Sequence, residues 1–309
     1  MPPLLTTSAV RAYQVCPRLY RHKYIDLWRQ VEDTEAMRLG TIIHAGLEAL
    51  LSGTDGHAAV GGLTSDPFLR VRARAMLRGY VARWGTPDKA DSVERVFRFP
   101  LPHPDDPSQD HPSVSIGGKW DAIKDGCVIE HKTTSWDITE GSLYWQRLEA
   151  DWQISHYTLA GMLDGIEVKG VLYDVLKVPE QRPLKATPED KRKFKKDGTL
   201  YANQRAEDET PEEYRVRITT AIMDNLDAHF ARRLVTRQPR HIRDHLRDAW
   251  DYAELMNAGH YPRNANACVT RGMRCAFYDV CHSGLDPAVR QDLFKRVEDP
   301  HPELMETVS

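Results

Sequence analysis

The stretch GGKWDAIKDGCVIEHKT, residues 117–133, brings together two acids and a lysine, Asp121, Glu130 and Lys132. Between them, Asp125-Gly126 separates two apolar, β-rich runs, which is a strong signal for a two-residue hairpin turn of type I′. Counting outward from this turn places Asp121 opposite Glu130, with Lys132 on the same face one pleat further along. The pattern therefore predicts two carboxylates as direct cross-strand neighbours, with Cβ atoms about 5 Å apart.

Two carboxylates so placed repel each other unless positive charge lies between them. Lys132 alone could supply that charge in a structural ion pair. A divalent cation could also supply it, because paired carboxylates are the oxygen ligands that hard cations prefer. The hairpin by itself leaves both interpretations open.

Two further pairs of polar residues have helical spacing. His44 and Glu48 are four residues apart in RLGTIIHAGLEALL, so they share one face of a helix. A lone histidine is usually structural, but His44 lies in an apolar stripe that should face the sheet. Gln153 and Tyr157 are likewise one turn apart, on the helix that follows the hairpin. Either pair alone indicates little.

The chain has five cysteines, and one of them, Cys127, lies in the apolar return strand, where we expect a small buried hydrophobe. Four remain, which is the number of a metal site: Cys16, Cys268, Cys275 and Cys281. They lack the paired C-x(2–4)-C knuckles of structural zinc sites. A four-thiolate iron–sulfur cluster is the other regular use, while zinc and plain buried thiols stay open.

The spacing of apolar residues predicts the elements that carry these side chains. A β-rich region at 93–135, interrupted by a Pro-rich loop, contains the hairpin, and VKGVLYDVLKV predicts a central strand. Residues 180–212 are polar and predict an insertion or flexible flap. Helices are expected at residues 9–24 with Thr7 or Ser8 as the N-cap, 35–51, 66–84, 141–163, 211–235 and 241–258. This order predicts a mixed sheet flanked by helices in one domain.

Composition restricts the class of protein. With 309 residues, 41% of them hydrophobic and 28% charged, the chain can bury a sizeable core and suits a soluble protein. No run approaches 18 consecutive apolar residues, and MPPLLTTSAV lacks the regions of a signal peptide. We therefore expect no membrane partner and a cytoplasmic location. The net charge of −3 gives no global attraction for nucleic acid.

Basic residues are concentrated in DKRKFKKDG at 190–198 and in the arginines from Arg232 to Arg247. Such runs are most often solvated helix faces. The run KRKFKKDGTLYANQ, residues 191–204, interleaves aromatic and basic residues, so it could clamp a single nucleic-acid strand by stacking and charge. It could equally be a disordered loop.

Taken in order, these motifs resemble the RecB-like branch of the PD-(D/E)XK nucleases, close to the CRISPR-associated and AddB-type members that carry an iron–sulfur cluster. The matching pieces span residues 16–281: CPRLYRHKY, GTIIHAGLE, GGKWD, IEHKT as the E-x-K element, QISHY as the Q-x-x-x-Y element, and the C-terminal cysteines. The sequence departs from the pattern at His131, where we expect an Asp or a more apolar residue, and in the long gap after Cys268.

The resemblance implies an α/β fold with a restriction-endonuclease-like core, a mixed β-sheet flanked by helices, whose N- and C-terminal helical segments are joined by a metal cluster. It implies a single nuclease domain over residues 1–309. Within it we expect a catalytic core at about 35–180, a flexible insertion at about 180–212 and a helical C-terminal part at 213–285.

The resemblance also implies roles for single residues. Asp121 and Glu130 would bind Mg²⁺ or Mn²⁺, with a nitrogen from His44 and the backbone carbonyl of His131. Lys132 would orient the attacking water or stabilise the charge of the transition state. The family's Q-x-x-x-Y element positions substrate and lysine, and for Gln153 and Tyr157 we favour contact with the DNA backbone. Cys16, Cys268, Cys275 and Cys281 would hold a [4Fe–4S] cluster.

The function implied is a metal-dependent deoxyribonuclease with an exonuclease preference for single-stranded DNA or DNA ends, in DNA processing, recombination or repair. The alternative is a DNA-binding scaffold module of a helicase–nuclease or CRISPR adaptation assembly, with little cleavage of its own. Intact Asp121, Glu130 and Lys132 argue against that alternative. A redox or radical enzyme built on the cluster is disfavoured, because the sequence lacks a C-x3-C-x2-C run and a nucleotide-binding Gly-rich loop.

Overall fold

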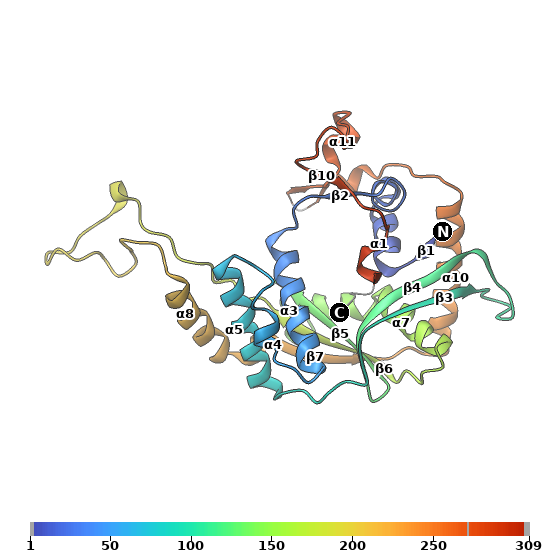
Figure 1. Cartoon of the computed structure of the whole chain (residues 1–309), viewed down its shortest axis with the longest axis horizontal. Coiled ribbons are helices and arrows are strands. Elements are labelled where there is room, and N and C mark those ends of the chain that lie inside the picture. Colours follow the sequence, from blue (N-terminus) through green and yellow to red (C-terminus); the bar gives the residue numbers. More distant parts are fainter. Residues whose placement is uncertain (1–2, 271, 306–309) are drawn as a thin grey trace.

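The computed structural model describes residues 3–270 and 272–305 of the chain. Its centre is a mixed sheet in the order β1-β4-β5-β6-β7, with β3 paired to β4 (Figure 1). The strands β1 and β4, and β5 and β6, run parallel, whereas the other neighbours are antiparallel. The strands of this sheet are β1 Leu4–Leu5, β3 Ser92–Pro102, β4 Asp110–Lys124, β5 Cys127–Thr134, β6 Gly170–Lys177 and β7 Phe230–Val235.

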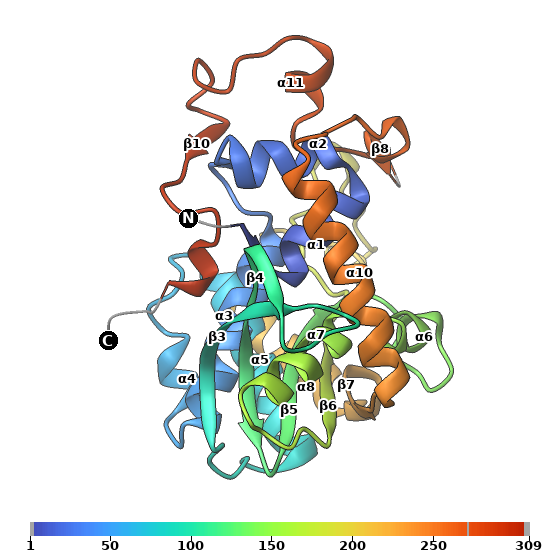
Figure 2. The ribbon, with the colours of Figure 1, turned by 90° about the vertical axis from the view of Figure 1, so that its right-hand side faces the viewer.

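Helices cover both faces of the sheet, and each face has its own apolar core (Figures 1 and 2). One layer contains α3 Glu35–Leu51, α4 Gly56–Ala59, α5 Pro67–Trp84 and α8 Pro211–Met223. The other contains α1 Thr7–Val15, α6 Leu143–Glu149, α7 Trp152–Leu163 and α10 Pro239–Asn257. This arrangement of helices on a mixed sheet is the predicted fold class and is consistent with a restriction-endonuclease-like fold.

Segments from the N-terminal and C-terminal parts of the chain meet beyond one edge of this sandwich, in the upper part of Figure 2 around α2, β10 and α11. There β2 and β10 form an antiparallel ladder that joins the first thirty residues to the last. This backbone pairing is one of the described contacts between the two segments, and the metal cluster expected to join them stays a prediction. The short elements here are α2 Pro17–Tyr20, η1 Arg21–Ile25, β2 Trp28–Gln30, β8 Val269–Thr270, β9 Met273–Arg274, α11 Tyr278–His282 and β10 Phe294–Arg296.

The predicted hairpin and two predicted helices are confirmed. Asp125 and Gly126 both have positive φ, 52° and 76°, as a type I′ turn requires. The register beside the turn is the predicted one, from Lys124↔Cys127 to Ala122↔Ile129. The helices α3 and α5 begin where the side chains of Thr34 and Asp66 accept backbone N–H bonds of the first turn.

The first helix begins and ends earlier than predicted. Thr6, not Thr7 or Ser8, is the N-cap, since its side chain accepts the N–H of Ala9. The helix stops at Val15 because the following Cys16 precedes Pro17 and is extended, with φ −164° and ψ 116°. The predicted helix over 9–24 is therefore three shorter elements.

Residues 141–163 form two helices instead of the single one predicted. The chain turns at Ala150 and Asp151, and the Asp151 side chain accepts the N–H of Gln153 to begin α7. Asp151 favours an N-cap over a helix interior because its carboxylate competes for backbone N–H groups. This break sets the direction in which α7 presents Gln153.

The predicted helix over 211–235 is also wrong at its C-terminal end. It stops at Met223, a single turn α9 (Leu226–His229) follows, and residues 230–235 form β7 antiparallel to β6. The sequence FARRLV contains the good helix formers Ala, Arg and Leu, so local propensity indicated a helix. Pairing with the open edge of β6 overrides that preference.

Two buried histidines predict acid sensitivity. His156 on α7 and His245 on α10 have ring centroids 5.5 Å apart. Burial lowers the pKa of His156 to about 4, and burial together with His156 lowers the pKa of His245 well below its ordinary value. Both are neutral when folded, whereas the unfolded chain takes up protons near pH 6.5. The free energy of unfolding should therefore fall as the pH drops from 7.5 to 5, by about 2 kcal/mol for each such histidine.

Urea unfolding at several pH values measures this loss. The His245→Leu variant removes one titrating ring from an apolar setting and should show a weaker pH dependence than the wild type. If the free energy of unfolding depended equally on pH in the two proteins, His245 would not contribute to the acid sensitivity.

Candidate active site

The strands β4 and β5 pair only beside the turn and then separate. Their ladder ends at Ala122↔Ile129, after which β4 continues along β3 and β1 while β5 continues along β6. The expected ladder pair of Asp121 with Glu130 is therefore not formed. Instead, the Asp121 carboxylate accepts the backbone N–H of His131 at 2.8 Å. On the other side of β4, Glu94 has a left-handed φ of 49°, so the irregularity extends into β3.

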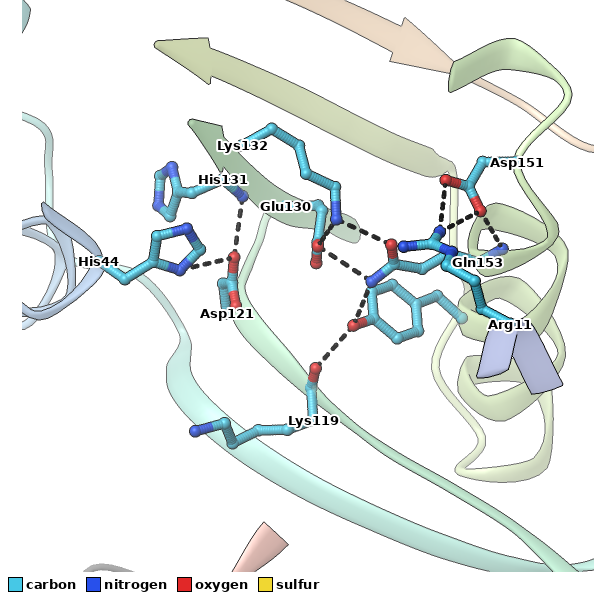
Figure 3. A network of polar contacts seen from close by, with 10 residues as sticks. Arg11, His44, Lys119, Asp121, Glu130, His131, Lys132, Asp151 and Gln153 are labelled. Atoms are coloured by element: carbon cyan, nitrogen blue, oxygen red, sulfur yellow. Dashed lines mark hydrogen bonds and ion pairs between the residues drawn. The ribbon is translucent and has the colours of Figure 1, made fainter. Parts of the chain in front are cut away.

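Glu130 is buried and is held by partners from two elements (Figure 3). The Lys132 ammonium donates to its Oε1, and the Gln153 amide nitrogen donates to the same oxygen at 2.9 Å. The Gln153 amide oxygen accepts from Lys132, also at 2.9 Å. Gln153 further donates to the Tyr157 hydroxyl, which donates to the backbone carbonyl of Lys119 on β4.

The described contacts of Gln153 and Tyr157 all lie within the protein, and their predicted role toward DNA stays a prediction. The sequence favoured direct contact with the DNA backbone, but both side chains are buried, with 7% and 5% exposure. Their donors are directed at protein groups. Gln153 fixes the acid relative to the lysine, and Tyr157 bridges the gap where the two strands separate.

His44 reaches the site from the opposite helical layer. Its Nδ1 lies 3.6 Å from Oδ2 of Asp121, as the apolar stripe of α3 predicts. Figure 3 shows Asp121 between His44 on one side and Glu130 on the other. The fork of the strands therefore brings Asp121, Glu130, Lys132 and His44 together from three elements.

The His131 side chain belongs to a second polar network behind the site. Its ring lies 5.9 Å from the ring of His44, and its Nδ1 lies 3.6 Å from Oδ2 of Asp174 on β6. Asp174 accepts hydrogen bonds from Tyr80 at 2.6 Å and from Arg232 at 3.1 Å. No sequence motif reveals Asp174, Tyr80 and Arg232 as a group, because they come from three separate elements and only folding brings them together.

Burial and neighbouring charges shift the pKa values of three groups at the fork, Asp121, Lys132 and His44. Burial, and then the charge of Glu130, raise the pKa of the Asp121 carboxyl well above its usual range. Burial lowers the pKa of Lys132, but the neighbouring carboxylates raise it more, so the lysine stays charged. Burial, His131 and Lys132 lower the pKa of His44 to about 3, which keeps its ring neutral. A neutral imidazole retains a lone pair for a cation.

The donor set fits a divalent cation in chemical type. Oε2 of Glu130 is buried without a hydrogen-bond partner, and it lies in a fork that also holds a second carboxylate and a neutral imidazole. Among residues 3–270 and 272–305, however, no group of three or more His, Cys, Asp or Glu side chains is arranged to hold a metal ion. The predicted ligand set is not assembled, because Asp121 is directed at the His131 amide and Glu130 at Lys132.

A cavity of about 480 Å³ opens beside this fork, between α3 and β4. Its lining includes His44, Glu48, Glu94, Lys119 and Asp121. Lys119 forms an ion pair with Glu94, and burial followed by the charge of Glu94 raises the pKa of Glu48. Lys119 stands two residues before Asp121, and this period-two spacing in the motif could have revealed it.

The four cysteines predicted as cluster ligands line one small cavity between the two ends of the chain. Cys16 lies at the junction of α1 and α2, and Cys268, Cys275 and Cys281 lie on the C-terminal segment. Burial, and then the neighbouring cysteines, raise the pKa of Cys281. The cavity of about 20 Å³ has room for about one water molecule. Cys127 does not line this cavity and is half-buried rather than fully buried.

The diverging strands of the mixed sheet thus present an Asp and a Glu-x-Lys pair, with a Gln-x-x-x-Tyr helix behind them, which are the motifs that resemble those of a nuclease. The family model of the PD-(D/E)XK nuclease superfamily matches residues 4–282, and the chain belongs to this superfamily. Membership implies a hydrolase that acts on nucleic acids. No curated protein matches the sequence.

Within the described part of the chain, no helix combines the length and the apolar composition needed to span a membrane.

The raised pKa of Asp121 predicts that its charge destabilises the metal-free protein. A carboxyl whose pKa is higher in the folded state contributes most stability below about pH 4, and this contribution is lost as the pH rises. Asp121→Asn should therefore raise the free energy of unfolding at pH 7 in EDTA, by on the order of 1 kcal/mol, with a smaller gain at pH 4. Urea unfolding measures this free energy. If the Asn variant were less stable than the wild type at pH 7, the charge of Asp121 would not destabilise the metal-free protein.

Proposed function

We propose that the chain is a metal-dependent DNA nuclease with an exonuclease preference for single-stranded DNA or DNA ends, acting in DNA processing, recombination or repair. The observation that carries this proposal is the fork of β4 and β5, where Glu130, Lys132 and Gln153 are joined beside Asp121. Residues 1–309 would act as one nuclease domain, alone or with a helicase or another recombination or CRISPR adaptation protein.

Asp121, Glu130, His44 and the backbone carbonyl of His131 would hold Mg²⁺ or Mn²⁺. When bound, the ion supplies a water of lowered pKa and neutralises charge on the phosphate. Lys132 keeps its proton beside the two acids and offers an ammonium to the scissile phosphate or to the attacking water. Gln153 holds Lys132 and Glu130 at a fixed separation, so the ammonium and the carboxylate act from set positions.

We also propose that Cys16, Cys268, Cys275 and Cys281 hold a [4Fe–4S] cluster. The support for it is that the four thiols line one cavity although the first is about 250 residues from the others in sequence. Such a link would close a long loop between the two ends of the chain and so offset its entropy. Its role would be structural.

The catalytic assignment is tested by Asp121→Asn, Glu130→Gln and Lys132→Met. Each should lower the cleavage of labelled single- and double-stranded DNA in Mg²⁺ and in Mn²⁺ by at least about 100-fold, because each removes a group that stabilises the transition state. Lys124→Met is the matched control, since Lys124 lies on the same hairpin and pairs with the exposed Asp88. Near wild-type cleavage by any of the first three variants would overturn the assignment.

The cluster is tested by its colour. Protein purified without oxygen should be brown, with the broad absorbance near about 400 nm that thiolate-bound iron–sulfur centres show. Cys16→Ser should remove the colour and lower the thermal stability, whereas the matched control Cys127→Ser should keep both. A colourless anaerobic preparation with stoichiometric zinc would show that the site holds a different metal.

A further inference from the structure

The insertion between β6 and α8 forms a hairpin arm, residues 184–209, that projects from the body of the protein (in yellow in Figure 1). The contacts that join its two legs include the pairs Leu184 with Glu209, Lys185 with Asp208, Thr187 with Arg205, and Phe194 with Leu200. The turn follows at Asp197-Gly198, where Gly198 has φ 80°. The segment thus folds back on itself, and the expected flexibility of this insertion stays a prediction.

Positive charge is concentrated in the outer part of this arm. Residues 185–205 contain seven Lys and Arg against three Asp and Glu, a net charge of +4, whereas three acids at residues 207–209 near the base reduce the net charge of the whole arm to +1. Three of these cations have acidic partners: Lys185, Arg192 and Arg205. The other four are exposed, and no carboxylate among the described residues lies within 4 Å of them: Lys191, Lys193, Lys195 and Lys196.

Two aromatic rings are exposed among these lysines. Phe194 is 60% exposed and Tyr201 is 49% exposed. Ammonium groups that follow a phosphate backbone, interleaved with rings on which bases stack, are the general features of single-strand binding without sequence preference. In a duplex the base faces are already stacked and would leave the two rings without partners. The charge and the rings together therefore favour a single strand.

The base of the arm adjoins the candidate active site. A cavity of about 500 Å³ is lined on one side by residues 178–180 and Arg182, which lead into the arm. Its other side is formed by residues 133–136 at the end of β5, directly after Lys132. Arg72 and Glu35 complete the wall. The cavity thus connects the arm with the strand that carries the catalytic lysine.

We propose that the hairpin arm binds the part of a single-stranded DNA substrate that lies outside the active site. The strand lies along the four lysines, stacks on Phe194 and Tyr201, and passes through the cavity beside residues 133–136 to the fork. This inference rests on the proposed nuclease function and adds a substrate-holding surface to it. The arm makes no contact with the reacting phosphate, so it affects binding and leaves the chemical step unchanged.

The test compares an arm variant, a ring variant and a control with the same change of charge. The arm variant replaces Lys191, Lys193, Lys195 and Lys196 by Gln, the ring variant is Phe194→Ala with Tyr201→Ala, and the control replaces the exposed Arg74, Arg78, Lys295 and Arg296 by Gln. Binding is measured by fluorescence anisotropy in EDTA over a range of salt. The probes are thymidine oligonucleotides of about 30 and about 6 nucleotides and a duplex of about 30 base pairs.

The arm variant should bind the long strand at least about 10-fold more weakly. Its plot of log K against log salt should be less steep by about 3, because four phosphate contacts are lost at about 0.7 each. The ring variant should lose about 10-fold with an unchanged salt slope. The control variant should bind like the wild type, and none of the changes should affect the short strand. In Mn²⁺, the arm variant should raise the KM of the long strand at constant kcat.

The outcomes separate this inference from the proposed function. If the wild type cleaves DNA but the arm variant binds and cleaves the long strand as the control does, the inference is overturned. It is also overturned if the duplex loses as much affinity as the long single strand. If the wild type cleaves no DNA, the proposed function fails, and the anisotropy results alone then support or overturn the arm as a single-strand binding surface.

Discussion

A carboxylate buried inside a sheet requires a compensating charge, and the arrangement around Glu130 follows from this requirement. Transferring an ion from water into a protein interior costs several kcal/mol unless charge and hydrogen bonds replace the water. Lys132 supplies the charge from the same strand, and Gln153 supplies a hydrogen bond from α7. The position of α7 depends in turn on its N-cap Asp151, which Arg11 of α1 binds through both carboxylate oxygens. The ion pair of Glu130 and Lys132 thus connects β5 to α7 and, through Asp151, to α1.

His131, the next residue on β5, faces a second buried carboxylate that also requires a compensating charge, in the other helical layer. His131 alternates with Glu130 and Lys132, so its ring faces α3 and α5 instead of α7. There it lies beside the buried Asp174, whose charge is balanced by Arg232 of β7. Three successive residues of one strand therefore require partners from both faces of the sheet. The fork can keep its geometry only while both helical layers are in place.

Local patterns in the sequence predicted the parts of this site that lie on single elements. The turn at Asp125-Gly126 and the helix starts at Thr34 and Asp66 depend on residues within a few positions, so they could be predicted from the sequence. The separation of β4 from β5 could not, because it depends on the competing pairing of β4 with β1 and of β5 with β6. The same limit applies to β7, whose residues prefer a helix until the edge of β6 is available.

The position of the cysteines follows from a mixture of local and distant constraints. Pro17 ends α1 and leaves Cys16 extended, where its sulfur accepts the N–H of Asn264 at 3.3 Å. The C-terminal segment reaches this point through short elements. A stack of rings holds it there, in which the ring centroid of Phe277 lies 4.9 Å from that of His22 and 5.2 Å from that of Phe294. Such short elements bury little apolar surface of their own, so the segment depends on contacts with the N-terminal residues. The proposed cluster, bound by thiols from both segments, would add a further link between them.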